Sequence, residues 1–307
     1  LDGKTIKMPV PQRAKDFDQH KFIKPLVAED YHQPFPDPGE VYQHVNTQLF
    51  NHIDDDNLKV EACKMNAPYN IPEFFPLPPL QMQGFVNDYI NTLQGLPPIK
   101  PPKGEQPKDY KNPDYDLYNV IMQCYTPDQI PVLTTLAKEF AVFDHWFCSV
   151  PSQTWCNRAF WHAATSGGEV VNPTDECGML NKGEAMVKWI DNVWSQPNLF
   201  QSMEDKGVSH AVYTEGMVSL TAMVNGLFKK EHVRRTGKKL RKFKRDLRKG
   251  RLPQYSFIKP QFMGQHNDQH PSSAGKSFVD GSTRVGTVLL GEKLIYDLYN
   301  AIKCSRK

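Results

Sequence analysis

Several features common in other protein classes are missing from this sequence of 307 residues. No apolar run approaches about 18 residues, so no transmembrane helix is predicted. The six cysteines include no Cys-x-x-Cys pair, which argues against a zinc knuckle and leaves disulfides undecided. No glycine pattern of the Rossmann or phosphate-loop type is present. The chain starts at Leu1 without an initiator Met or a signal-peptide pattern, so we expect a processed protein or a fragment.

Proline, by contrast, is abundant, with 25 residues. Many of these prolines gather in three stretches, at residues 34–38, 72–79 and 97–107. Because proline fixes φ and lacks an N–H group, residues 1–113 are predicted to be largely irregular or extended, with a surface loop at 97–113. Helical patterns interrupt this region at 41–49 and 80–90.

Positive charge is concentrated in one segment, residues 229–251, which holds 13 Lys and Arg residues against Glu231 and Asp246. Since the whole chain carries +3, the remainder carries about −8. Within the segment Leu240, Phe243 and Leu247 recur at helical spacing, which predicts a helix with one buried and one solvated face. The functional alternative is attraction to anionic lipid headgroups or to nucleic acid.

The second half of the chain alternates helical and strand patterns. A helix at 199–203 is followed by Gly207 and a strand at 209–213, and a further strand fits 252–260. A last helix is predicted from about Ser282 to Lys303. This succession is typical of an α/β fold, in which helices cover a parallel sheet.

The segment around Thr154 combines a turn with the start of a helix. Residues 141–143 look like the beginning of a short buried strand, and the helical pattern starts near Thr154 and stops at 165–168. The free N–H groups at a helix start attract anions. Thr154 is therefore either an ordinary helix cap or a reactive hydroxyl at the mouth of an anion site.

Several stretches together decide between these alternatives. They are Tyr125-Thr-Pro-Asp-Gln-Ile-Pro-Val-Leu133, Leu136-Ala-Lys-Glu-Phe-Ala-Val-Phe-Asp144, the turn at 147–154, and Asn157-Arg158. They resemble the phosphoesterase family of bacterial and plant phospholipases C and bacterial acid phosphatases, within the alkaline phosphatase superfamily. The resemblance implies that Thr154 is the nucleophile that forms a phospho-threonine intermediate.

The same resemblance implies a fold and its boundaries. We expect a single alkaline-phosphatase-like α/β domain over residues 1–307, with a mostly parallel central sheet flanked by helices and incomplete at both ends. Its parts are the irregular region 1–113, a nucleophile core at 114–228, a basic helix at 229–251 and a C-terminal part at 252–307. The periplasm or the extracellular space is the implied location.

Two further residues receive roles from the resemblance. Asn157 would steady the phosphoryl oxygens together with the amides of the helix start. Family members carry Asp-Asp-His-Pro after a strand, and His270 matches this histidine, although Gln269 replaces the second aspartate. His270 would contact the phosphoryl group or protonate the leaving oxygen. Many relatives also have His after an Asp-Pro-Gly turn; Glu40 stands there instead, so no phosphate ligand is assigned.

A divalent cation at the Thr154 hydroxyl would activate it, and such a cation needs carboxylate ligands. The family supplies them from a Glu-Asn pair near the amino end and an Asp-Glu pair beyond the last helix, and neither motif occurs here. The resemblance runs from about Asp37 to Lys303. We therefore expect the middle of a longer enzyme for phosphomonoesters or phospholipids, with the 307 residues by themselves inactive or nearly so and the metal bound only in the longer protein.

Two other functions compete with this one. The first is a non-catalytic module that binds anionic membranes, or nucleic acid, through residues 229–251. The second is a cysteine nucleophile, either Cys148 or Cys156, beside His145 or His162. Cys148 lies in an apolar run, so we expect it to be buried and inert. Arg158 is interpreted as a structural residue that pairs inside the fold.

Overall fold

The computed structural model describes residues 6–31, 34–53, 80–96, 106–172, 196–214, 221, 233–235, 240–261, 266–270 and 287–305. The chain divides into two compact units. The first contains residues 1–129 and 271–285, and the second contains residues 130–270 and 286–307. The single domain predicted over residues 1–307 stays a prediction.

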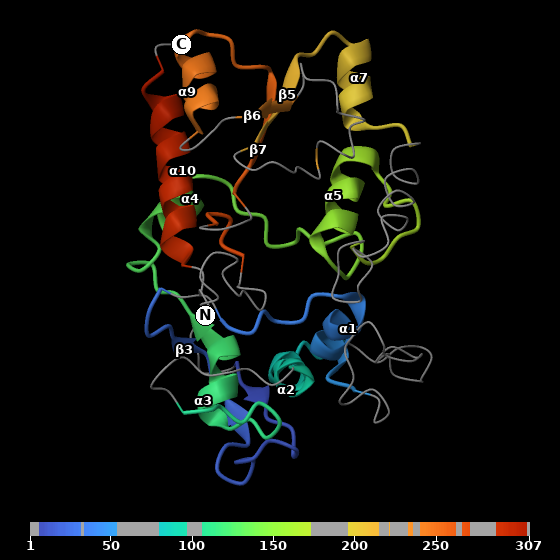
Figure 1. The fold of residues 1–307 in the computed structure, drawn as a ribbon, viewed down its shortest axis with the longest axis vertical. Helices are drawn as coiled ribbons and strands as arrows, with labels where there is room; N and C mark the ends of the chain where they lie inside the picture. The colour runs from blue at the N-terminus through green and yellow to red at the C-terminus, as the bar shows by residue number, and fades with distance from the viewer. Residues whose placement is uncertain are drawn as a thin grey trace. The chain divides into compact units, whose positions relative to one another are not determined.

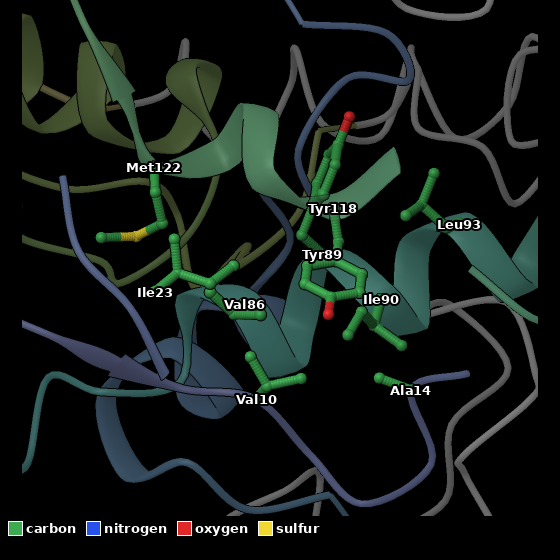
Figure 2. Packing of buried hydrophobic residues seen from close by; sticks show 9 residues of the cluster. All are labelled: Val10, Ala14, Ile23, Val86, Tyr89, Ile90, Leu93, Tyr118 and Met122. Carbon is green, nitrogen blue, oxygen red and sulfur yellow. The ribbon is translucent and has the colours of Figure 1, made fainter. Parts of the chain in front are cut away.

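The first unit is built around one helix. Its helices are α1 (Tyr42–Phe50), α2 (Phe85–Gly95), α3 (Tyr115–Tyr118) and the 3-10 helix η3 (Asn119–Met122). Its strands are β1 (Met8–Pro9), antiparallel to β2 (Phe22–Ile23), and β3 (Leu26–Val27), parallel to β4 (Gln123–Cys124). The buried side chains surround α2 (Figure 2): Val10, Ala14, Ile23, Val86, Tyr89, Ile90, Leu93, Tyr118 and Met122.

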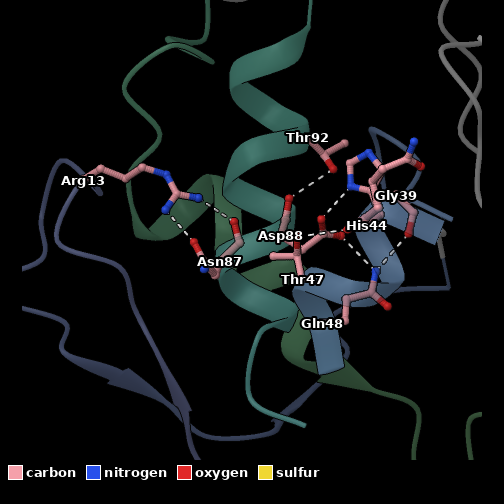
Figure 3. Close-up of polar contacts among 9 residues, drawn as sticks. Arg13, Gly39, His44, Thr47, Gln48, Asn87, Asp88 and Thr92 are labelled. Atoms are coloured by element: carbon pink, nitrogen blue, oxygen red, sulfur yellow. Dashed lines mark hydrogen bonds and ion pairs between the residues drawn. The ribbon is translucent and has the colours of Figure 1, made fainter. Parts of the chain in front are cut away.

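Polar contacts hold the opposite face of α2 (Figure 3). His44 of α1 pairs with the buried Asp88 of α2, with 2.5 Å between Nδ1 and Oδ1, and Gln48 donates to the other carboxylate oxygen at 2.9 Å. Arg13 donates to the side chain and to the backbone carbonyl of Asn87. The predicted helices at 41–49 and 80–90 therefore exist, although the second is shifted to 85–95.

The second unit contains a parallel sheet. β5 (His210–Thr214) lies between β6 (Val233–Arg235) and β7 (Tyr255–Lys259), and both neighbours run parallel to it. The strands predicted at 209–213 and 252–260 are confirmed, and so is their parallel arrangement.

Helices cover both faces of this sheet (Figure 1). On one face Phe200 and Met203 of α7 (Leu199–Asp205) pack with Val212, and α5 (Thr154–Ala163) contacts α7. On the other face α9 (Arg241–Arg248) and α10 (Val288–Lys303) cover Ala211 and Tyr213. α4 (Pro131–Glu139) packs against α10. This mixture of helices and small parallel sheets is compatible with the predicted α/β class, whereas the alkaline-phosphatase-like arrangement stays a prediction.

Three predicted elements differ from the structure. Residues 141–143 are exposed coil, with Val142 65% and Phe143 70% exposed, and no strand among the described residues pairs with them. The basic helix is confined to α9, since 233–235 pair with β5 instead and Leu240 adopts a left-handed φ of 54°. The last helix begins at Val288, where Thr287 Oγ1 accepts from the Leu289 amide, while 282–286 lie outside the described residues.

One part of the basic-helix prediction is confirmed. Leu240 and Phe243 are almost completely buried, and Leu247 packs beside them against β5 and β7. Among the helices of the described ranges, none is long and apolar enough to cross a membrane.

Candidate active site

Thr154 is the first residue of α5, as predicted. Gln153 occupies the N-cap position, so the interpretation of Thr154 as the cap is wrong. Thr154 is exposed, and its hydroxyl makes no hydrogen bond with any residue that the structure describes. The helix ends at Ala163, followed by Ala164 with a φ of 56°. The hydroxyl is thus accessible at the positive end of the helix dipole.

The amides of this helix start are partly occupied. Trp155 N–H donates to Asn172 Oδ1 at 2.9 Å, and Asn172 N–H donates to Gln153 Oε1 at 2.8 Å. Asn172 and Gln153 therefore form a reciprocal cap that sequence reasoning missed. No local signal could have found it, because the two residues are 19 positions apart.

Asn157 lies one turn into α5, and its amide is turned toward the preceding turn. Its Oδ1 accepts from Val150 N–H at 3.0 Å, and its Nδ2 lies 2.8 to 3.2 Å from the carbonyls of Val150, Ser152 and Gln153. In this state the amide holds the backbone that leads to Thr154. Direct contact of Asn157 with a phosphoryl oxygen stays a prediction and would require these bonds to be exchanged.

α5 runs antiparallel to β7. Trp161 Nε1, in the last turn of α5, lies 3.4 Å from the hydroxyl of Tyr255 at the start of β7. Nearer the start of the helix, Arg158 lies over the ring of Phe257, and it interacts electrostatically with Lys259 at the end of the strand. The start of α5 and the carboxyl end of β7 therefore lie at the same end of the unit, where parallel α/β sheets commonly bind ligands.

The loop that carries His270 is held at this end by several contacts. Gln261 N–H donates to Asn267 Oδ1 at 2.7 Å, and Gln269 Nε2 donates to the carbonyl of Val288 at 3.2 Å. His266 Nδ1 lies 2.7 Å from Asp268 Oδ1, which also accepts from the backbone N–H of His270 at 3.2 Å.

Because Asp268 also interacts electrostatically with Arg158, the loop that carries His270 lies near the first turns of α5. Thr154, Asn157 and His270 are thus brought to one region of the second unit. Thr154 and His270 do not hydrogen-bond to each other in the described part of the chain.

The alternative with Cys156 as the nucleophile is not supported by the geometry. Cys156 is fully buried, and burial raises the pKa of its thiol to about 11, which disfavours the thiolate. Burial lowers the pKa of His162 to about 4, and the ring stacks on Phe200 instead of contacting a thiol. The prediction that Cys148 is buried is wrong, because it lies in the exposed segment after α4.

The described residues do not fit the divalent cation that the resemblance implies. Within the described ranges no group of three or more His, Cys, Asp and Glu side chains could hold a metal ion. Asp268, which interacts electrostatically with Arg158 of α5, already binds His266. We therefore assign no metal ligand among these residues apart from the predicted contact with the Thr154 hydroxyl.

The fold and the site define an α/β protein with an accessible hydroxyl at a helix start, next to the carboxyl end of a parallel sheet. A model of the phosphoesterase family matches residues 36–287, and the chain belongs to this family.

Curated relatives include plant and bacterial proteins. Non-specific phospholipase C1 of Arabidopsis thaliana is 34% identical over 286 residues, which are 91% of this chain and 43% of the relative. Non-specific phospholipase C3 of the same plant is 27% identical over 88% of this chain and 40% of the relative. Phospholipase C B of Mycobacterium tuberculosis is 27% identical over 66% of this chain and 38% of the relative. The chain thus spans about two fifths of the length of these relatives.

Proposed function

We propose that the protein hydrolyses phosphoester bonds, with Thr154 as the nucleophile that carries the phosphoryl group between two steps. The observation that supports this proposal is the exposed Thr154 hydroxyl at the start of α5, to which no described residue hydrogen-bonds. The loop that contains His270 lies near the same helix, because its Asp268 interacts with Arg158. Membership of the phosphoesterase family supports the reaction class. The relatives named phospholipase C support a phospholipid substrate, with phosphomonoesters as the other substrate class.

The proposed reaction has two steps. In the first, Thr154 Oγ forms a bond to phosphorus and gives up its proton to solvent, while the bond from phosphorus to the alcohol oxygen breaks. That oxygen receives a proton from His270, and solvent then protonates His270 again. In the second, water attacks the phospho-threonine, which releases phosphate or a phosphorylated headgroup and restores the hydroxyl. Asn157 contributes by holding the turn at 150–153, which fixes where Thr154 stands.

The cation remains a separate proposal. When bound at the Thr154 hydroxyl, a divalent ion would favour its ionised form. Because the described residues do not supply a set of ligands, no step is assigned to the ion. Because the ion would need ligands from the longer protein, we also propose that the 307 residues alone are inactive or nearly so.

The experiment compares Thr154→Ala with Thr154→Ser in the natural polypeptide that contains these residues. Hydrolysis of an aryl phosphate and of phosphatidylcholine is measured, and acid-quenched reactions are searched by mass spectrometry for phosphate on residue 154. We expect Thr154→Ala to lose turnover and the adduct, and Thr154→Ser to keep both in part. Thr135→Ala, which changes an exposed threonine on α4, is the matched control and should keep full activity. Undiminished turnover by Thr154→Ala would refute the assignment.

No finding favours the non-catalytic alternative. Within α9, Lys242 pairs with Asp246 at 2.7 Å, and Lys244 pairs with Asp297 of α10 at 3.6 Å, so part of its charge is compensated inside the unit. Contact of residues 229–251 with an anionic membrane stays a proposal that sedimentation with anionic vesicles would test. A nucleic-acid partner is not proposed. We propose a periplasmic or secreted location for the protein, which cell fractionation would test.

A further inference from the structure

The segment between α4 and α5 exposes a group of large apolar side chains (Figure 1). Phe140, Val142, Phe143, Trp146 and Phe147 are each between 59% and 78% exposed. Exposed apolar side chains on protein surfaces are usually scattered singly, whereas these lie within one short stretch, segment 140–147. A contiguous group of this kind marks a surface that binds another polypeptide or a membrane.

The exposed apolar surface extends onto two helices of the second unit. The ring centres of Phe143 and Trp146 are 6.0 Å apart, and Trp146 lies 5.4 Å from Trp161 of α5, which is 52% exposed. At the other end of the segment, the ring centres of Phe140 and Tyr299 of α10 are 6.4 Å apart. Exposed aromatic side chains thus extend from α5, along segment 140–147, to α10.

The backbone of this segment is also without partners. Residues 140–143 read Phe-Ala-Val-Phe, so a strand formed by them would be apolar on both faces, as the inner strands of parallel sheets are. The backbone groups of Ala141 and Val142 make no hydrogen bond with any residue that the structure describes. Pairing with strands of another segment would satisfy these groups and bury both apolar faces.

The parallel sheet of the second unit is incomplete next to this surface. β5, with a strand on each side, is buried at all five positions, whereas all five positions of β7 are only partly buried. In the described part of the chain, no strand pairs with the edge of β7 opposite β5. Trp161, which contacts Trp146, also reaches Tyr255 of β7, with 3.4 Å between Nε1 and the hydroxyl. The sheet can therefore be extended on the side where the apolar surface lies.

A membrane fits this surface poorly. Lipid cannot hydrogen-bond the backbone groups of Ala141 and Val142. Asp144 and His145, with side chains 90% and 86% exposed, would also have to enter the bilayer with the aromatic rings. A further part of the same polypeptide fits better, because strands satisfy backbone and side chains together.

The relatives indicate how much polypeptide is available. Phospholipases C1 and C3 of Arabidopsis thaliana align with 91% and 88% of this chain, but the aligned parts are only 43% and 40% of those relatives. More than half of such a protein therefore lies outside the aligned region, which is ample for several strands of five to six residues each.

We propose that segment 140–147 contributes an inner strand to a larger sheet, and that strands from residues of the natural polypeptide outside these 307 pair with it and cover its apolar side chains. The same pairing would fix the start of the turn at 150–153, which leads to Thr154. The proposal concerns assembly of the fold and does not depend on the proposed reaction.

The first test identifies what lies on the surface. Phe143 is replaced by the photoreactive p-benzoyl-phenylalanine in the natural polypeptide, the monomer is isolated by size-exclusion chromatography and irradiated, and the cross-linked peptides are sequenced by mass spectrometry. We expect cross-links to residues outside the 307. Cross-links to residues within the 307, cross-links to a second copy, or no cross-linked peptide would each overturn the proposal.

The second test measures burial in the unmodified natural polypeptide. Backbone amides of residues 141–143 should exchange hydrogen at least about a hundredfold more slowly than unprotected amides, as expected for a paired strand. Exchange at the unprotected rate would overturn the proposal.

A pair of matched variants tests whether the segment matters for stability. Val142→Asp would bury a charge, so it should lower the melting temperature of the natural polypeptide by about 5 °C or more. Val170→Asp changes a valine that is 44% exposed outside the segment and should shift it by less than about 2 °C. Equal shifts would overturn the proposal, and so would a Val142→Asp variant that keeps its melting temperature but no longer sediments with phosphatidylcholine vesicles. Cross-linking and exchange provide the readout if Val142→Asp does not fold.

Discussion

Asn157 binds the backbone of Val150 in both directions: its Oδ1 accepts from the Val150 amide at 3.0 Å, and its Nδ2 donates to the Val150 carbonyl at 2.8 Å. A side chain that hydrogen-bonds both the N–H and the carbonyl group of one residue fixes the position and the orientation of that residue's backbone. The turn from Val150 to Gln153 is thereby attached to the helix that it starts. The placement of Thr154 depends on this attachment.

Removal of the Asn157 amide should therefore destabilise the fold. We expect Asn157→Ala to lower the free energy of unfolding by about 2 kcal/mol, because several backbone groups lose their partner. Asn157→Asp should cost at least as much, since a carboxylate cannot donate to the carbonyls of Val150, Ser152 and Gln153. Urea denaturation measures both. Asn300→Ala removes one exposed bond, to the carbonyl of Tyr296, and should cost less than about 0.5 kcal/mol. Equal losses for the two asparagines would contradict the turn-holding role.

His162 should make stability depend on pH. The ring is 2% exposed, its Nε2 has no hydrogen-bond partner in the described residues, and it is enclosed by Phe200 and Phe257. Its pKa of about 4 lies below the usual value of about 6.5, so the unfolded chain binds a proton that the folded chain does not. The contribution of the neutral His162 ring to the free energy of unfolding is fully present above pH 6.5. It is lost as the pH falls toward 4, which lowers the free energy of unfolding by about 2 kcal/mol.

The measurement is the free energy of unfolding between pH 7 and pH 4. His162→Gln should flatten the decline over this range, whatever its effect at pH 7. His145, whose side chain is 86% exposed, provides the control. His145→Gln should leave the decline of the free energy of unfolding between pH 7 and pH 4 as it is in the parent. A decline that persists unchanged in His162→Gln would assign the pH dependence to other groups.

Local patterns in the sequence were sufficient to predict the helix and the strands that carry the candidate site. The alternation around Tyr213 and Phe257 predicted β5 and β7, and the helical pattern after the turn predicted that α5 begins at Thr154. These patterns depend on neighbours in the sequence, so they survive without tertiary information. The resemblance then supplied Thr154, Asn157 and His270 as a group.

Tertiary relationships explain what the sequence could not show. Asn172 caps the amide of Trp155 across 17 positions, which no spacing rule anticipates. Residues 141–143 have the composition of a buried strand, but burial also needs a partner surface, and the described residues provide none. The surroundings of Arg158 depend on the register between α5 and β7, so the sequence alone could not show that its guanidinium group lies over the ring of Phe257.

Like Asn172, Glu292 accepts hydrogen bonds from backbone amides at the start of a helix in the second unit. Its two carboxylate oxygens accept from the amides of Val132 and Leu133, at 2.7 and 3.1 Å, at the start of α4. The residue is 4% exposed, and its partners are about 160 positions away. Glu292→Ala should lower the free energy of unfolding by about 2 kcal/mol, because two buried amides lose a charged partner. Glu292→Gln, which keeps one acceptor oxygen, should cost less. If urea titrations show both variants as stable as the parent, the carboxylate does not hold α4.

Metal removal tests whether the proposed hydrolysis depends on a divalent ion at Thr154. Such an ion would need ligands that the described residues do not provide, so we expect it to be bound in the longer polypeptide. Treatment of the natural polypeptide with a chelator should therefore reduce phosphoester hydrolysis at least tenfold, and a divalent ion should restore it. Hydrolysis that survives thorough chelation would reject the metal at Thr154.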